Sequence, residues 1–246
     1  MVYAAAYCPV SYKDTLKTLS FADSKVLTPQ IRSDLLEQLC SPSSDHLFNS
    51  VGWSARIMTA SDISAAMLSP IAYNLNAQAH DTTIALIRDI INQGVNITEI
   101  YVDTVGPEST YQGKLQKHFP GAVVTVTKKA DSKFPIVSAA SVCAKVTRDV
   151  YLGNEEVWGS GYPSDPRTAK WLKGESMDKV FGWSSDEVRY SWSTTRELLE
   201  KSKDCVKVDW HDDDTQGMAS ITSFFGDTGK TASSRWYGPN VLASEF

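Results

Sequence analysis

The chain has 246 residues, of which 42% are hydrophobic and 22% are charged, and it carries a formal net charge of −5. These proportions are typical of a globular protein long enough to bury a sizeable core. No stretch approaches the ~18 consecutive apolar residues of a membrane helix, so no membrane partner is expected. An acidic chain binds nucleic acid only where basic residues gather on one face or a partner supplies them.

The cysteines and histidines show no spacing typical of a zinc site or a disulfide framework. The four cysteines are Cys8, Cys40, Cys143 and Cys205, and no two of them form a CxxC pair. This spread favours free thiols in a reducing compartment. The opening residues, MVYAAAYCPV, lack the basic flank of a signal peptide and are interpreted as a strand.

Strands and helices alternate along the first 152 residues. The predicted strands are residues 2–8, 51–60, 97–103 and 122–129. The predicted helices are residues 28–40, 74–94, 109–118 and 136–152. Thr28 is placed to cap the first of these helices, and Gly94 to end the second. The alternation indicates an α/β core, in which functional sites collect beyond the carboxyl ends of strands.

The texture changes twice after this core. The stretch that follows is helical in pattern, with Asp165 and Pro166 opening one helix. From about residue 211 the chain is rich in Asp, Ser, Thr and Gly, which is typical of a tail that partners order. The predicted organisation is a core over residues 1–152, a helical extension over 153–210 and a flexible tail over 211–246.

Two predicted strands are followed by an aspartate. Asp103 ends the stretch ITEIYVD, and Asp131 follows the stretch TVTKK. Two such carboxylates at neighbouring strand ends supply the oxygen ligands that divalent cations prefer. Each alone is better explained as a helix cap or a turn residue. Their arrangement, together with Tyr162 in the constrained loop SGYPSDP, favours a site, whereas Asp149 is expected to make structural contacts.

Several long motifs carry a resemblance to a known family. The stretches VDTVGPESTYQGKLQKHFPG, KKADSKFPIVSAASVCAKVTRD and GSGYPSDPRTAKWL are similar to the catalytic subunit of eukaryotic type 2 ribonuclease H. LSFADSKVLT, residues 19–28, resembles the DSK segment of that family. The resemblance covers residues 1 to about 210, and the tail resembles eukaryotic members at ITSFF and SSRWY.

The resemblance implies a fold, an activity and a set of site residues. The fold is a ribonuclease H-like mixed β-sheet flanked by helices, with a helical C-terminal extension. The activity is endonucleolytic cleavage of the RNA strand of RNA–DNA hybrids and of single ribonucleotides in DNA, using two Mg²⁺ or Mn²⁺ ions held by four carboxylates. Asp103 and Asp131 match two of those carboxylates. Tyr162 matches the tyrosine that stacks on the sugar beside the ribonucleotide, and Lys25 lies near the phosphates. Lys129 either contacts phosphate or decorates a solvated strand end.

The resemblance also implies partners and a compartment. The family works in the nucleus, and in the cytoplasm as an alternative, as a heterotrimer with two accessory subunits. The stretch MASITSFF resembles a degenerate motif for the replication sliding clamp, in which Ile221, Phe224 and Phe225 enter an apolar pocket. The alternative is that these residues pack on the accessory subunits.

One motif of the family is missing from the sequence. The DEAGRG motif, which holds the first two carboxylates and normally precedes the position of Val2, does not occur. Two aspartates hold one hydrated Mg²⁺ weakly and are not expected to fix two ions about 3.5–4 Å apart. The chain as written is therefore expected to have little or no activity, and the alternative is a non-catalytic hybrid-binding or assembly subunit of the same fold.

Overall fold

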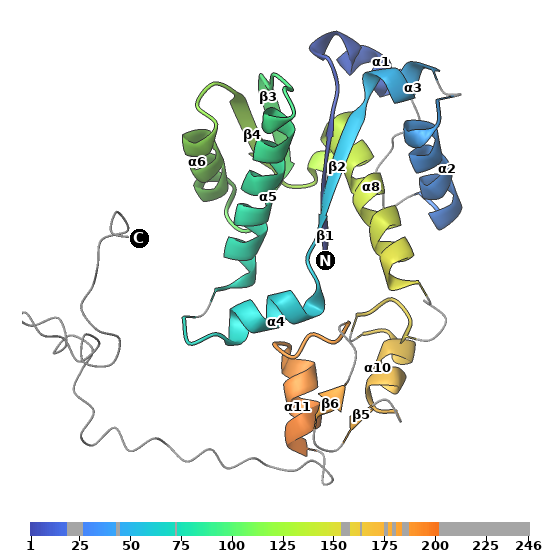
Figure 1. Cartoon of the computed structure of the whole chain (residues 1–246), viewed down its shortest axis with the longest axis vertical. Coiled ribbons are helices and arrows are strands. Elements are labelled where there is room, and N and C mark those ends of the chain that lie inside the picture. Colours follow the sequence, from blue (N-terminus) through green and yellow to red (C-terminus); the bar gives the residue numbers. More distant parts are fainter. Residues whose placement is uncertain are drawn as a thin grey trace, which may run out of the picture. The chain divides into compact units, whose positions relative to one another are not determined.

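The computed structural model describes most of the chain up to residue 201. The described residues are 1–18, 27–42, 45–71, 73–153, 158–162, 164–174, 177–178, 181–183 and 187–201. All of them belong to one compact unit that spans Met1–Cys205. None of the helices in these ranges is long and apolar enough to cross a membrane. Figure 1 shows how the elements are arranged.

The first half of the core is an antiparallel strand pair packed on helices. β1 (Val2–Tyr7) pairs with β2 (Gly52–Ile57). The helices that accompany the pair are η1 (Val10–Tyr12), α1 (Lys13–Thr18), α2 (Pro29–Cys40), α3 (Asp45–Ser50) and α8 (Pro135–Leu152). Leu16, Leu35 and Val142 from these helices form a buried cluster on which the alanines of β1 pack.

The second half is a parallel strand pair with its own core. β3 (Glu99–Asp103) and β4 (Val123–Thr127) are rich in β-branched residues, which suit a pleated surface covered by helices. The helices of this half are α4 (Ala60–Leu68), α5 (Leu75–Asn92), α6 (Glu108–His118) and α7 (Ala130–Lys133). Leu115 and Tyr111 of α6 are almost fully buried against β4 and α5.

The extension after α8 forms a small third cluster. Its described elements are α10 (Pro166–Leu172), β5 (Met177–Asp178), β6 (Gly182–Trp183) and α11 (Ser193–Lys201). Trp183 is 3% exposed, and its indole nitrogen donates to the carbonyl of Leu172 at 3.1 Å. The predicted helical extension therefore also contains a short antiparallel strand pair.

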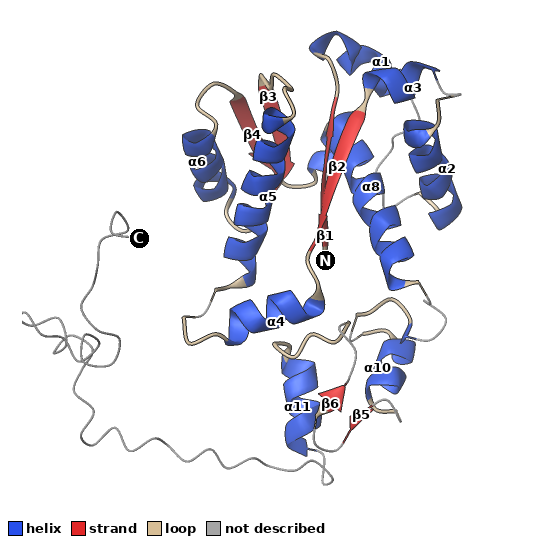
Figure 2. Ribbon diagram, in the orientation of Figure 1, coloured by secondary structure: helices blue, strands red, loops and turns tan. Residues whose placement is uncertain are grey.

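The strands form separate pairs. Within the described ranges, no ladder joins β1–β2 to β3–β4, as the strands drawn in Figure 2 indicate. The two halves also bury separate apolar clusters. The mixed strand directions and flanking helices agree with the predicted α/β class.

The sequence prediction needs corrections at two boundaries. The strand predicted over 122–129 ends at Thr127, because Lys129 adopts a left-handed backbone with a φ of 54°. The strand predicted over 51–60 ends at Ile57, and α4 begins at Ala60. Thr59 and Asp62 form a capping box that starts α4, a signal the pattern analysis missed.

Candidate active site

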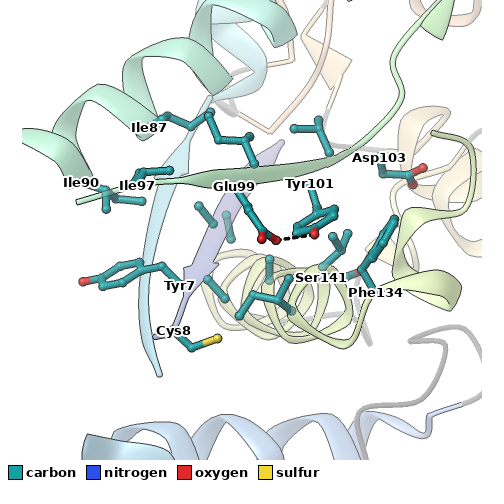
Figure 3. A pocket seen from close by; sticks show the side chains of 18 of the residues that line it. Tyr7, Cys8, Ile87, Ile90, Ile97, Glu99, Tyr101, Asp103, Phe134 and Ser141 are labelled. Carbon is teal, nitrogen blue, oxygen red and sulfur yellow. Dashed lines mark hydrogen bonds between the residues drawn. The ribbon is translucent and has the colours of Figure 1, made fainter. Parts of the chain in front are cut away.

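Asp103 lies at the carboxyl end of β3, on one face of the strand. Because side chains alternate along a strand, Asp103 shares its face with Glu99 and Tyr101, and Figure 3 shows all three beside the same cavity. The opposite face carries Ile100, which is buried in the core of the second half. The apolar face anchors the strand, and its other face delivers the carboxylate to the edge of the sheet.

Asp131 lies four residues beyond β4, in the first turn of α7. The parallel register sets Asp103 opposite Thr127, so both strands end at the same edge. The left-handed conformation of Lys129 then turns the chain sharply into α7. Asp131 is 7% exposed and follows Ala130, which is fully buried. The prediction that Asp131 directly ends a strand is therefore corrected to a position on this helical turn.

Backbone amides orient both carboxylates. Oδ1 of Asp103 accepts from the amide of Ala130 at 3.2 Å and from the amide of Thr104 at 3.1 Å. Oδ1 of Asp131 accepts from the amide of Ser132 at 3.1 Å. The bond to Ala130 ties the end of β3 to the residue that precedes Asp131. The structure therefore brings the two predicted carboxylates to one edge, where both line a single cavity.

The two carboxylates fit a cation site of low ligand number. Aspartate oxygens are the donors that Mg²⁺ and Mn²⁺ prefer, and Mg²⁺ keeps several waters when a protein supplies one or two carboxylates. In the part of the chain that the structure describes, no group of three or more His, Cys, Asp or Glu residues is placed to hold a metal. Asp103 and Asp131 are thus the residues that could bind a divalent ion here.

Glu108 is a supporting residue that the sequence analysis missed. Its carboxylate accepts from the amide of Lys128 at 2.9 Å, which fixes the chain between β4 and α7. Glu108 opens α6, twenty residues earlier in the chain. No local pattern connects the two positions, because their meeting depends on the β3–β4 pairing.

Tyr162 projects from a tightly bonded loop in the extension, and its side chain is 59% exposed. Asp165 accepts from the amides of Ser160 at 2.8 Å and Arg167 at 2.9 Å. These two backbone N–H groups lower the pKa of Asp165 to about 2. Thr168 accepts from the amide of Gly161 at 3.1 Å, and the amide of Asp165 donates to the carbonyl of Tyr162. Tyr162 is thus presented to solvent, and it does not line the cavity that holds the aspartates.

The remaining predicted residues divide into two groups. Lys129 lies at the turn between β4 and α7, where its carbonyl accepts from the Ser132 hydroxyl at 2.8 Å. Asp149 forms ion pairs with Arg148 and Arg32, in agreement with a structural role. The residues Lys25, Ile221, Phe224 and Phe225 lie outside the described residues.

Comparison with known proteins identifies the family. Residues 1–195 match the sequence profile described as Ribonuclease HII. The chain belongs to the ribonuclease HII family. A ribonuclease H2 subunit of Schizosaccharomyces pombe is 52% identical to it, over 97% of this chain and 74% of that protein.

Two solved ribonuclease HII structures share the fold. The ribonuclease H2 of Pyrococcus horikoshii OT3 has a TM-score of 0.62 at 25% identity and covers 81% of this chain and 98% of its own. The ribonuclease HII in a complex with PCNA from Archaeoglobus fulgidus has a TM-score of 0.56 at 26% identity, covering 70% of this chain and 77% of that chain. The expected ribonuclease H-like fold and the class of ribonuclease H endonuclease are confirmed. The roles of individual residues stay predictions.

Proposed function

We propose that this chain is the catalytic subunit of a type 2 ribonuclease H and acts on the RNA strand of RNA–DNA hybrids and on single ribonucleotides in DNA. The observation that carries the proposal is the bond from Ala130 to Asp103, which holds two carboxylates at one strand edge. A Mg²⁺ or Mn²⁺ ion bound there would activate a water and offset charge on the phosphate.

The chain's own residues have separate roles in this proposal. Asp103 and Asp131 supply oxygen ligands, and the amides of Ala130 and Ser132 fix their orientation. Tyr162 offers an exposed ring on which the sugar beside a ribonucleotide stacks. The bonds of Asp165 and Thr168 hold that ring in place before substrate arrives, which reduces the ordering that binding requires.

The described site holds fewer ligands than two-metal chemistry needs. Two ions about 3.5–4 Å apart require more carboxylates than Asp103 and Asp131 provide, and the described residues contain no larger cluster. We therefore expect the 246-residue chain to bind hybrid but to cleave it little or not at all. The same observation favours the second candidate function, a non-catalytic hybrid-binding or assembly subunit.

A cleavage and binding assay tests both parts. The substrate is a DNA duplex with one ribonucleotide, the control is the all-DNA duplex, and each is tested with Mg²⁺ and with Mn²⁺. The expected result is tighter binding of the ribonucleotide duplex, loss of that preference in Tyr162→Ala, and little cleavage. Robust cleavage refutes the low activity. Equal affinity for the two duplexes contradicts the proposed substrate.

The tail supports a proposal about partners. The Schizosaccharomyces pombe relative is named as a subunit, and the Archaeoglobus fulgidus neighbour was solved in a complex with PCNA. We infer that this chain acts in the nucleus with two accessory subunits, and that Ile221, Phe224 and Phe225 dock on them or on a sliding clamp. A Phe224→Ala/Phe225→Ala variant should lose one of these interactions. Unchanged binding to both kinds of partner would exclude this role.

A further inference from the structure

The space between the two strand pairs has two strand edges as its walls. β1 pairs with β2 through one edge and β3 pairs with β4 through one edge. Across the ranges that the structure describes, no strand pairs with the second edge of β1 or of β3. Every residue of β1 and every residue of β3 lines one cavity of about 600 Å³ between them.

Helices close this cavity on both faces. α5 contributes Leu86, Ile87 and Ile90 on one side, and α8 contributes Ile136 and Ala140 on the other. Figure 3 shows Ile87 and Ile90 on one side of β3 and Ser141 of α8 on the other. The lining is therefore aliphatic above and below and backbone at the sides. An element that fills it needs apolar side chains on both faces and hydrogen-bonding groups along both edges.

The exposure of β1 shows that the cavity leaves this strand unfinished. All six residues from Val2 to Tyr7 remain partly exposed, although helices pack against the strand. In contrast, Val124 and Val126 of β4 are 3% and 5% exposed. A strand covered on both faces normally carries buried apolar side chains. The missing contact of β1 is therefore at its edge.

The direction of the two walls is set by an ion pair. Lys13, which follows β1, donates to Glu99 at the start of β3, with an Nζ–Oε2 distance of 3.0 Å. The carboxyl end of β1 therefore lies by the amino end of β3. A strand that enters between them runs parallel to one wall and antiparallel to the other, and both arrangements form regular ladders.

We propose that this cavity is an acceptor site for one additional β-strand, an extended segment of about five or six residues with apolar side chains on both faces. It pairs with β1 and β3 at once and joins the two strand pairs into one sheet of five strands. A small apolar ligand also fits the volume, which lies in the usual range for such pockets. It would leave the backbone groups of both edges unpaired, whereas a strand satisfies them.

A peptide-binding experiment on the 246-residue chain tests the proposal without metal or substrate, so its outcome is independent of the proposed function. The probe is a labelled peptide with six central Val and Ile residues between charged ends. The control peptide has the same length and carries proline at two central positions, which removes the donors a ladder needs. Fluorescence anisotropy measures binding, and hydrogen exchange maps it.

The expected result is saturable binding of the Val/Ile peptide, with amides protected in both β1 and β3. Amides of α11 serve as the internal reference and should not change. Ala140→Phe places a ring in the cavity and should weaken binding by about tenfold or more. Ala65→Phe makes the same change on the exposed side of α4 and should not weaken it. If Ala140→Phe fails to fold, as judged by circular dichroism, Ala144→Phe replaces it, since Ala144 lines the same cavity.

Four results overturn the proposal. The first is an absence of saturable binding at every soluble peptide concentration. The second is protection of only one of the two strands. The third is equally tight binding of the proline peptide, which indicates a pocket for apolar ligands. The fourth is a dimer of the free chain with both edges already protected, which makes a second copy the occupant.

Discussion

The strand ends and the Tyr162 loop each present a candidate site residue, but different forces hold them. Asp103 and Asp131 stand on a buried apolar core, in which Leu115 is fully buried beneath the β3–β4 pair. The Tyr162 loop is held by hydrogen bonds from polar side chains, above all the carboxylate of Asp165. The first arrangement depends on packing, and the second depends on charge and backbone geometry.

This difference separates the perturbations to which the two regions respond. Removing buried apolar volume should loosen the strand ends and leave the loop bonded. Adding a Cβ atom or protonating a carboxylate should disturb the loop and leave the strand ends in place. Each prediction below applies one such perturbation and asks whether the other region stays unaffected.

The largest effect is expected from Leu115→Ala in the core below the strand ends. Loss of a fully buried leucine should lower the free energy of unfolding by about 2–5 kcal/mol, because a cavity remains. Urea unfolding measures the change. Leu68→Ala is the matched control, since Leu68 is 64% exposed and its loss should change stability by less than about 0.5 kcal/mol. Similar values for the two variants would mean that the strand pair does not depend on this core.

A smaller effect is expected from Gly159→Ala in the loop. Gly159 has a φ of 71°, and a Cβ atom there would lie 2.7 Å from Oδ2 of Asp165. The strain should cost about 1–3 kcal/mol of unfolding free energy and displace the loop. Gly113→Ala is the control, because Gly113 lies in α6 with open space around it and should gain stability by about 0.5–1 kcal/mol. Equal effects would show that the loop is not constrained as described.

The pH response of the loop should be confined to strongly acidic solution. The pKa of Asp165 is lowered from 3.8 to about 2 by the amides of Ser160 and Arg167. The ionised carboxylate therefore stabilises the loop above about pH 4, and this contribution is lost as the pH falls through 2. An NMR titration of the Asp165 side-chain carboxyl carbon should give a midpoint near 2. A midpoint at or above 3.8 would show that these bonds do not hold the loop.

The sequence predicted the parts of the site that rest on local patterns. Asp103 follows a β-branched run, and Asn74, the residue at which the predicted helix 74–94 starts, caps α5 with its side chain. The left-handed turn at Lys129 was not predicted, because lysine rarely adopts that conformation and only the tertiary structure selects it. The bond from Lys128 to Glu108 was missed for a related reason, since it joins residues that only strand pairing brings together.

The central claim is that Asp103 and Asp131 form one cation site, and Mn²⁺ titration by calorimetry tests it most directly. The account predicts one binding event that Asp103→Asn and Asp131→Asn each weaken by about tenfold or more, the scale at which even supporting residues of metal sites act. Asp14→Asn, on the exposed surface of α1, should leave affinity unchanged. Parental affinity in both site variants, with their folds intact by circular dichroism, would contradict the account.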